Sequence, residues 1–159
     1  MTDKLLLFVD GSVNNQLEVG CGAYLVINEQ EVSNISQEPI IYVKTFENTS
    51  STKLELQTLL WALDEIEVAG KTVVIFTDSQ NSAGLLDRRA ALESTDYRSG
   101  KNKFLNNHEL YRTFFKVTDE LDCEFVKVKG HQPSRHKVQE DRLFSLVDRA
   151  ARKALKALI

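Results

Sequence analysis

The segment TVVIFTD, residues 72–78, carries an uninterrupted apolar run that ends at an acid, Asp78. A strand with one face in water alternates apolar and polar side chains, whereas a strand buried on both faces is apolar throughout. The segment therefore predicts an inner strand of a sheet that is covered on both sides. Any fold for this chain has to supply that cover from its other elements.

Several segments with different patterns flank this strand. Three apolar stretches precede it, and their short connections predict an antiparallel meander over residues 4–10, 20–28 and 40–46. From residue 52 to residue 68 the leucines recur at helical spacing, with Ser51 or Thr52 as the expected N-cap and Gly70 as terminator. We further predict helices over 79–91, 107–121 and 138–158, a loop over 93–103 and a last strand over 123–130. The predicted order is β-β-β-α-β-α-α-β-α.

Length and composition set the class of protein. The chain has 159 residues, of which 42% are hydrophobic and 27% charged, so we expect one globular domain over residues 1–159. No apolar run approaches the roughly 20 residues that cross a bilayer, and the N-terminal apolar stretch has no small-residue cleavage site before Asp10. Cys21 and Cys123 are far apart and have no partner at ligand spacing. We therefore expect reduced thiols in a cytoplasmic protein, with neither a disulfide nor a zinc site.

Charge is distributed unevenly along the chain. The net charge is −3, but residues 1–70 hold 11 acidic and 3 basic side chains, whereas residues 71–159 hold 12 acidic and 17 basic ones. This skew fits a molecule with a metal-binding pole and a phosphate-facing pole, although a solvated lysine-rich C-terminal helix explains much of it equally well.

Four acids stand among residues of core character. Asp10 and Asp78 end apolar strands, and Glu55 and Asp148 lie on predicted helices. Burial opposes ionisation, so four such acids brought together would repel one another unless cations neutralised them. Carboxylate oxygens suit Mg²⁺, and two such ions about 4 Å apart are a common device for phosphodiester cleavage. The acids therefore predict a magnesium-dependent nuclease.

Five short segments support a more specific resemblance. They are VDGS at 9–12, LELQTLLWAL at 54–63, FTDSQ at 76–80, VKVKGH at 126–131 and VDRAARKAL at 147–155. In this order and at these distances, the chain resembles ribonuclease H of type 1, including its retroviral relatives, over essentially its whole length. The resemblance implies an α/β, ribonuclease H-like fold, with a five-stranded mixed sheet (three antiparallel and two parallel strands) and helices on both faces.

The resemblance also implies an activity. Members cut the RNA strand of RNA–DNA hybrids and leave 5′-phosphate and 3′-hydroxyl ends, using two Mg²⁺ ions per site, with Mn²⁺ as an alternative. It assigns metal-binding and catalytic roles to four acids, Asp10, Glu55, Asp78 and Asp148, with Asp10 bridging the ions. His131 matches a histidine that assists proton transfer or the release of metal and product. We expect a monomer that binds a hybrid duplex, with no membrane or protein partner.

Substrate contacts are implied for a second group of residues. Gly11, Ser12, Glu55 and Gln80 match groups that read the 2′-hydroxyls of the RNA strand, and Ser51 and Thr52 occupy the place of an asparagine pair. Hydroxyl groups can donate to phosphate but lack the paired donor and acceptor of an amide. The basic helical protrusion of some members is shortened here to a loop that keeps five cations, Arg88, Arg89, Arg98, Lys101 and Lys103. The shortening predicts weaker, more salt-sensitive binding of the hybrid.

The fourth acid has two candidates. Asp141 and Asp148 follow His131 by 10 and 17 residues, and on a helix both point roughly the same way. The segment around Asp148 matches the family pattern better, and small alanines at 150, 151 and 154 would let that turn approach the sheet. We therefore select Asp148.

Three other readings remain open at this stage. The same fold occurs in DNA nucleases of the resolvase and transposase type, against which the context of Gln80 counts. A non-catalytic nucleic-acid-binding module would have lost one of the acids, and a plain scaffold would use them only as caps and turn residues. The five ordered segments favour the nuclease.

Overall fold

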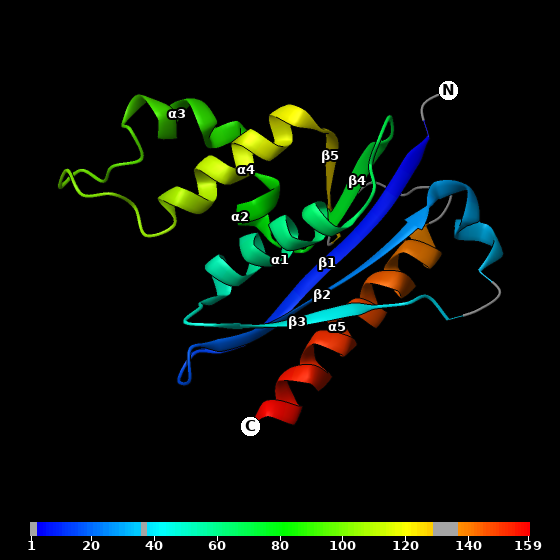
Figure 1. The fold of residues 1–159 in the computed structure, drawn as a ribbon. Helices are drawn as coiled ribbons and strands as arrows, with labels where there is room; N and C mark the ends of the chain where they lie inside the picture. The colour runs from blue at the N-terminus through cyan, green and yellow to red at the C-terminus, as the bar shows by residue number, and fades with distance from the viewer. Residues whose placement is uncertain (1–2, 36–37, 129–136) are drawn as a thin grey trace.

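The structure is a computed structural model that describes residues 3–35, 38–128 and 137–159. Its five strands form one mixed sheet in the order β3-β2-β1-β4-β5 (Figure 1). The strands are β1 (Lys4–Asn14), β2 (Val19–Asn28), β3 (Tyr42–Glu47), β4 (Thr72–Thr77) and β5 (Asp122–Lys127). The first three pair antiparallel, and β4 pairs in parallel with both β1 and β5. This arrangement confirms the predicted sheet.

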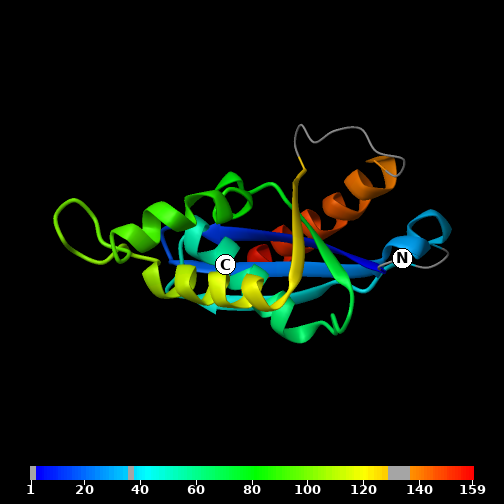
Figure 2. The same cartoon turned by 90° about the horizontal axis from the view of Figure 1, so that it is seen from above.

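Helices cover both faces of the sheet (Figures 1 and 2). On one face, α1 (Ser51–Glu65) and α4 (His108–Glu120) bury aromatic and leucine side chains against β1 and β4. On the other face, α5 (Lys137–Leu158) packs Leu143, Val147 and Ala151 against the sheet. All six residues of β4 are buried, as the apolar run predicted. Both cysteines are free, and no described helix is long and apolar enough to cross a membrane.

Some boundaries differ from the prediction. The helix expected over 79–91 is divided into α2 (Gln80–Ala83), a 3₁₀ turn (Leu86–Arg88) and α3 (Arg89–Ser94), because Gly84 caps the end of α2. The N-cap of α1 is Ser50, whose hydroxyl accepts from Lys53 N, and not Ser51 or Thr52. The 3₁₀ helix over Glu29–Asn34 was not predicted.

Three glycines allow α1 to lie close to the sheet. A Cβ atom at Gly22 would stand 2.1 Å from the hydroxyl of Thr58, and Cβ atoms at Gly11 and Gly20 would stand 2.8 and 2.7 Å from Leu54. Real Cβ atoms do not approach other atoms so closely. A larger residue at Gly22 would push Thr58 and α1 outward, whereas at Gly11 or Gly20 the end of the Leu54 side chain would have to move. Gly22 therefore limits the distance between the sheet and the helix that carries Glu55.

We expect Gly22→Ala to lower the free energy of unfolding by about 1–3 kcal/mol, because the new methyl group overpacks the contact with Thr58. Gly100→Ala is the matched control, since nothing lies within 4 Å of its added methyl group. Urea denaturation of both variants measures the difference. Equal stability of the two would mean that α1 does not depend on this close approach.

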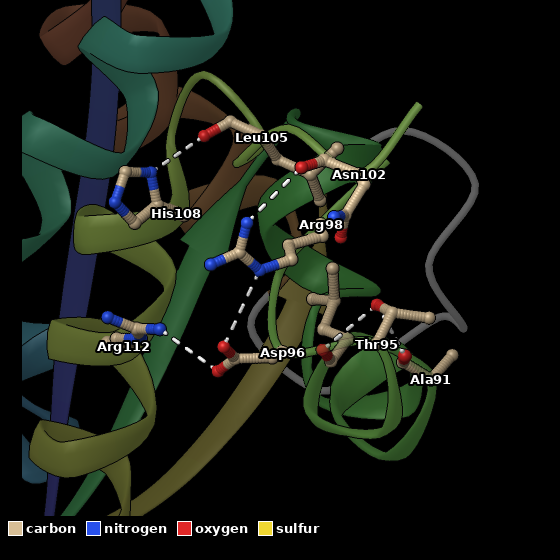
Figure 3. A network of polar contacts seen from close by, with 9 residues as sticks. Ala91, Thr95, Asp96, Arg98, Asn102, Leu105, His108 and Arg112 are labelled. Carbon is tan, nitrogen blue, oxygen red and sulfur yellow. Dashed lines mark hydrogen bonds and ion pairs between the residues drawn. The ribbon is translucent and has the colours of Figure 1, made fainter. Parts of the chain in front are cut away.

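The loop between α3 and α4 is held by charged and aromatic contacts, and Figure 3 shows the charged ones. Asp96 pairs with Arg98 at 3.7 Å and with Arg112 at 3.3 Å. The guanidinium of Arg98 lies 4.0 Å from the ring centre of Phe104, which in turn stacks on His108 at 4.5 Å. The segment is thus an ordered loop beginning just after Ser94, near the predicted start at residue 93.

Candidate active site

The predicted acids lie around the point where β1 and β4 part. These strands pair from Lys4 and Thr72 to Phe8 and Phe76. Asp10 lies two residues beyond the last pair on β1, and Asp78 directly follows β4. Crevices beyond the carboxyl ends of strands, at such points of divergence, are the usual ligand sites of open α/β sheets.

Two helices bring the remaining acids to this point from opposite faces. Glu55 lies in the first turns of α1, and a small cavity is lined by Val9, Asp10, Glu55, Thr58, Thr77 and Asp78. Asp148 comes from α5 and shares a hydrogen bond with Asp10. The structure thus gathers three of the predicted acids in one cavity and places the fourth against Asp10.

Asp10 is the most perturbed of these carboxyl groups. Burial, the hydrogen bond with Asp148 and the charge of Asp78 together raise the pKa of Asp10 to about 8, against a smaller opposing effect of the Gly11 N–H. Each of the three main causes disfavours the negative charge. Without a cation, the site therefore favours the protonated form of Asp10 over the ionised form.

Glu55 is held by a residue that the sequence analysis did not select. The hydroxyl of Ser79 donates to Oε2 of Glu55 at 2.6 Å. Burial raises the pKa of Glu55, the Ser79 bond lowers it, and the charge of Asp78 raises it. A serine directly after a strand-ending acid was the available signal, but it predicts a helix cap as readily as a contact with a residue 24 positions away.

The two candidates for the fourth acid have different surroundings. Asp148 contacts Asp10 and also accepts from Arg152, through Nε at 3.1 Å and Nη2 at 2.6 Å. Asp141 pairs with Lys137 at 3.5 Å. Arg152 is 68% exposed, so its bond to Asp148 competes with water and contributes little to stability.

The acids of the site provide a donor set suited to a cation. Within residues 3–35, 38–128 and 137–159, no three acidic, histidine or cysteine side chains form a group that could hold one metal ion. The available donors are nevertheless all hard carboxylate oxygens, and the crowding of Asp10 by Asp78 and Asp148 is what a divalent cation relieves. The residues fit Mg²⁺ in kind and charge, and side-chain reorientation would have to complete the set.

The predicted substrate-binding residues surround these acids along the chain. Gly11 and Ser12 continue β1 beyond Asp10, and Ser51 and Thr52 are exposed in the first turn of α1. Gln80 begins α2, is exposed, and accepts from Lys127 Nζ at 3.4 Å. His131 lies outside the described residues.

Comparison with known proteins agrees with the fold. A family model described as RNase H matches residues 2–156, so the chain belongs to the RNase H family. The solved structure of a foamy viral protease–reverse transcriptase in complex with double-stranded DNA is similar to this fold, with a TM-score of 0.64, 14% sequence identity, and coverage of 94% of this chain and 94% of that one. No curated protein matches the sequence. Family membership supports ribonuclease H activity for this chain.

Proposed function

We propose that this chain is an endonuclease that hydrolyses the RNA strand of RNA–DNA hybrids with two Mg²⁺ ions, leaving 5′-phosphate and 3′-hydroxyl ends. The observation that carries the proposal is the gathering of Asp10, Glu55 and Asp78 in one cavity, with Asp148 against Asp10, in a chain of the RNase H family. DNA nucleases with the RNase H fold would use a similar cluster, so the nucleic acid that is cut distinguishes them from a ribonuclease H.

The four acids would hold the metal ions. When bound, Mg²⁺ supplies activation of a water and neutralisation of charge on the phosphate and on the leaving 3′-oxygen. Asp10 gains most from a cation, because it is partly buried and faces two other acids. Glu55 keeps a fixed orientation through Ser79. His131, following β5 in the sequence, would assist proton transfer or product release.

Hybrid recognition would use the groups next to these acids. Backbone groups of Gly11 and Ser12 and the amide of Gln80 would contact 2′-hydroxyls, which distinguish RNA from DNA. The hydroxyls of Ser51 and Thr52 are exposed in the first turn of α1, where they could donate to phosphate oxygens.

The five loop cations are not equally available for contacts with the phosphate groups of the substrate. Arg88 bonds Asn81, Arg89 pairs with Asp119, and Arg98 pairs with Asp96. Each of these bonds occupies a guanidinium that could otherwise contact a phosphate. Lys101 and Lys103 are exposed and form no ion pair within the described part of the chain, so they are the better candidates for phosphate contacts.

Cleavage of four matched duplexes tests the proposal: an RNA–DNA hybrid, double-stranded RNA, double-stranded DNA and single-stranded RNA. Only the hybrid should be cut, EDTA should abolish the cutting, and added Mg²⁺ should restore it. Equal cleavage of double-stranded DNA would assign the chain to the resolvase or transposase type of nuclease. Hybrid binding without cleavage in Mg²⁺ or Mn²⁺ would indicate a non-catalytic module.

A further inference from the structure

Ser79 follows one of the acids in the chain and bonds another, Glu55, through its buried hydroxyl. It directly follows Asp78, is only 5% exposed, and is the N-cap residue of α2. We propose that Ser79 is a positioning residue that fixes the carboxylate of Glu55 through Oε2 and leaves Oε1 as the oxygen that binds Mg²⁺. The inference rests on the proposed metal-dependent function and names a residue that governs the metal site without touching the metal.

The directions of the bonds at Ser79 follow from the chemistry of their partners. Its hydroxyl accepts from the backbone N–H of Ser82 at 3.1 Å, and an N–H can only donate. The single hydroxyl proton is therefore free for Oε2 of Glu55, at 2.6 Å, and an ionised carboxylate can only accept. A hydrogen bond to a charged acceptor is about twice as strong as a neutral one.

Ser79 is itself held in place. Its own N–H donates to the hydroxyl of Thr77 at 3.0 Å, and Thr77 is a buried residue of β4. The chain of bonds runs from the central strand through Ser79 to Glu55 on α1. A glutamate has several rotatable bonds, so an unanchored Glu55 would lose more conformational entropy when it binds a cation. Anchoring one oxygen of Glu55 before the cation binds removes part of this entropy cost. Residues that hold a metal ligand without touching the metal raise metal affinity in this way.

A simple helix cap is the competing explanation. In that case Ser79 stabilises α2 through Ser82 N alone, and its loss should reduce stability by about 1 kcal/mol without affecting metal binding. Ser50→Ala is a matched control for this effect, because Ser50 caps α1 through Lys53 N and bonds no acidic side chain among the described residues. The two explanations therefore differ in the Mg²⁺ affinity that they predict for Ser79→Ala, and this affinity can be measured without catalysis.

Calorimetric titration of the substrate-free protein with Mg²⁺ tests the inference. We expect Ser79→Ala to weaken Mg²⁺ binding roughly 10-fold and to lower kcat at limiting Mg²⁺, with the KM for the hybrid unchanged. Ser79→Thr keeps the hydroxyl and should restore binding, whereas Ser50→Ala should bind as the wild type does. If Ser79→Ala does not fold, Ser79→Cys replaces it, because its thiol keeps the size and is a weaker donor.

Wild-type Mg²⁺ affinity in Ser79→Ala, or in Ser79→Cys where that variant replaces it, would overturn the inference, as would a wild-type protein that binds no Mg²⁺. Failure of the proposed function has a different signature, in which the wild type binds Mg²⁺ but does not cut the hybrid. In that case the titrations alone still decide whether Ser79 positions Glu55.

Discussion

Asp10→Asn is expected to lower turnover on an RNA–DNA hybrid by roughly 10²–10³-fold while making the metal-free protein more stable. Turnover falls because a neutral amide replaces a carboxylate that would help to hold the cations. Stability rises because Asp10 is partly buried and faces Asp78 and Asp148, so the amide relieves a repulsion that the folded state imposes. An amide can also donate to the Asp148 carboxylate.

The stability difference has a defined dependence on pH. An unfolded aspartate loses its proton at about pH 3.9, whereas Asp10 in the folded protein keeps its proton until about pH 8. Between these values the folded state binds more protons, so the wild type loses stability as the pH rises. Asp10→Asn lacks this loss, and its advantage should grow from near zero at pH 4 to about 1–3 kcal/mol at pH 8.

Urea denaturation in EDTA at several pH values measures this advantage, and hybrid cleavage in Mg²⁺ measures turnover. Lys71→Ala is a suitable control, because Lys71 precedes β4 at the opposite end from Asp78. Near-normal turnover of Asp10→Asn would remove Asp10 from the metal site. A variant less stable than the wild type at pH 8 would mean that its neighbours do not repel Asp10.

The second large effect distinguishes Asp148 from Asp141. We expect Asp148→Asn to reduce turnover at limiting Mg²⁺ by roughly 10–100-fold, because Asp148 contacts Asp10. The turnover of Asp141→Asn should stay within about 2-fold of the wild-type value, because this variant loses only a half-exposed ion pair with Lys137. Both substitutions keep the size of the side chain and remove one charge, so each serves as the other's control.

Measuring both variants over a range of Mg²⁺ concentrations separates a loss of affinity from a loss of maximal rate. Excess Mg²⁺ should partly restore Asp148→Asn. A larger loss in Asp141→Asn would show that the fourth acid lies in the earlier turn of α5, at the shorter spacing of 10 residues from His131.

The parts of the fold that were predictable are those with a strong repeating pattern. The apolar run of β4 predicted burial on both faces, and helical spacing located α4 and α5 to within one or two residues. The start of α1 was less certain because Ser50, Ser51 and Thr52 can all cap a helix. The structure selects Ser50, whose hydroxyl reaches Lys53 N.

The detailed contacts of the site were not predictable, because they join residues far apart in sequence. The Ser79–Glu55 bond spans 24 positions, and local patterns do not encode it. The glycines beneath α1 were visible in the sequence, but their contact with Leu54 and Thr58 depends on the paired register of β1 and β2. The roles of the acids therefore remain proposals that their placement supports.

One measurement tests the proposed nuclease most directly. A hybrid that carries different fluorescent labels on its RNA and DNA strands is incubated with the wild type and with Asp10→Asn, purified in parallel, in Mg²⁺. The wild type should cut the RNA strand alone and leave 3′-hydroxyl ends that a polymerase can extend, and Asp10→Asn should leave both strands intact. Cleavage of the DNA strand, or equal cleavage by the two proteins, would contradict the proposal.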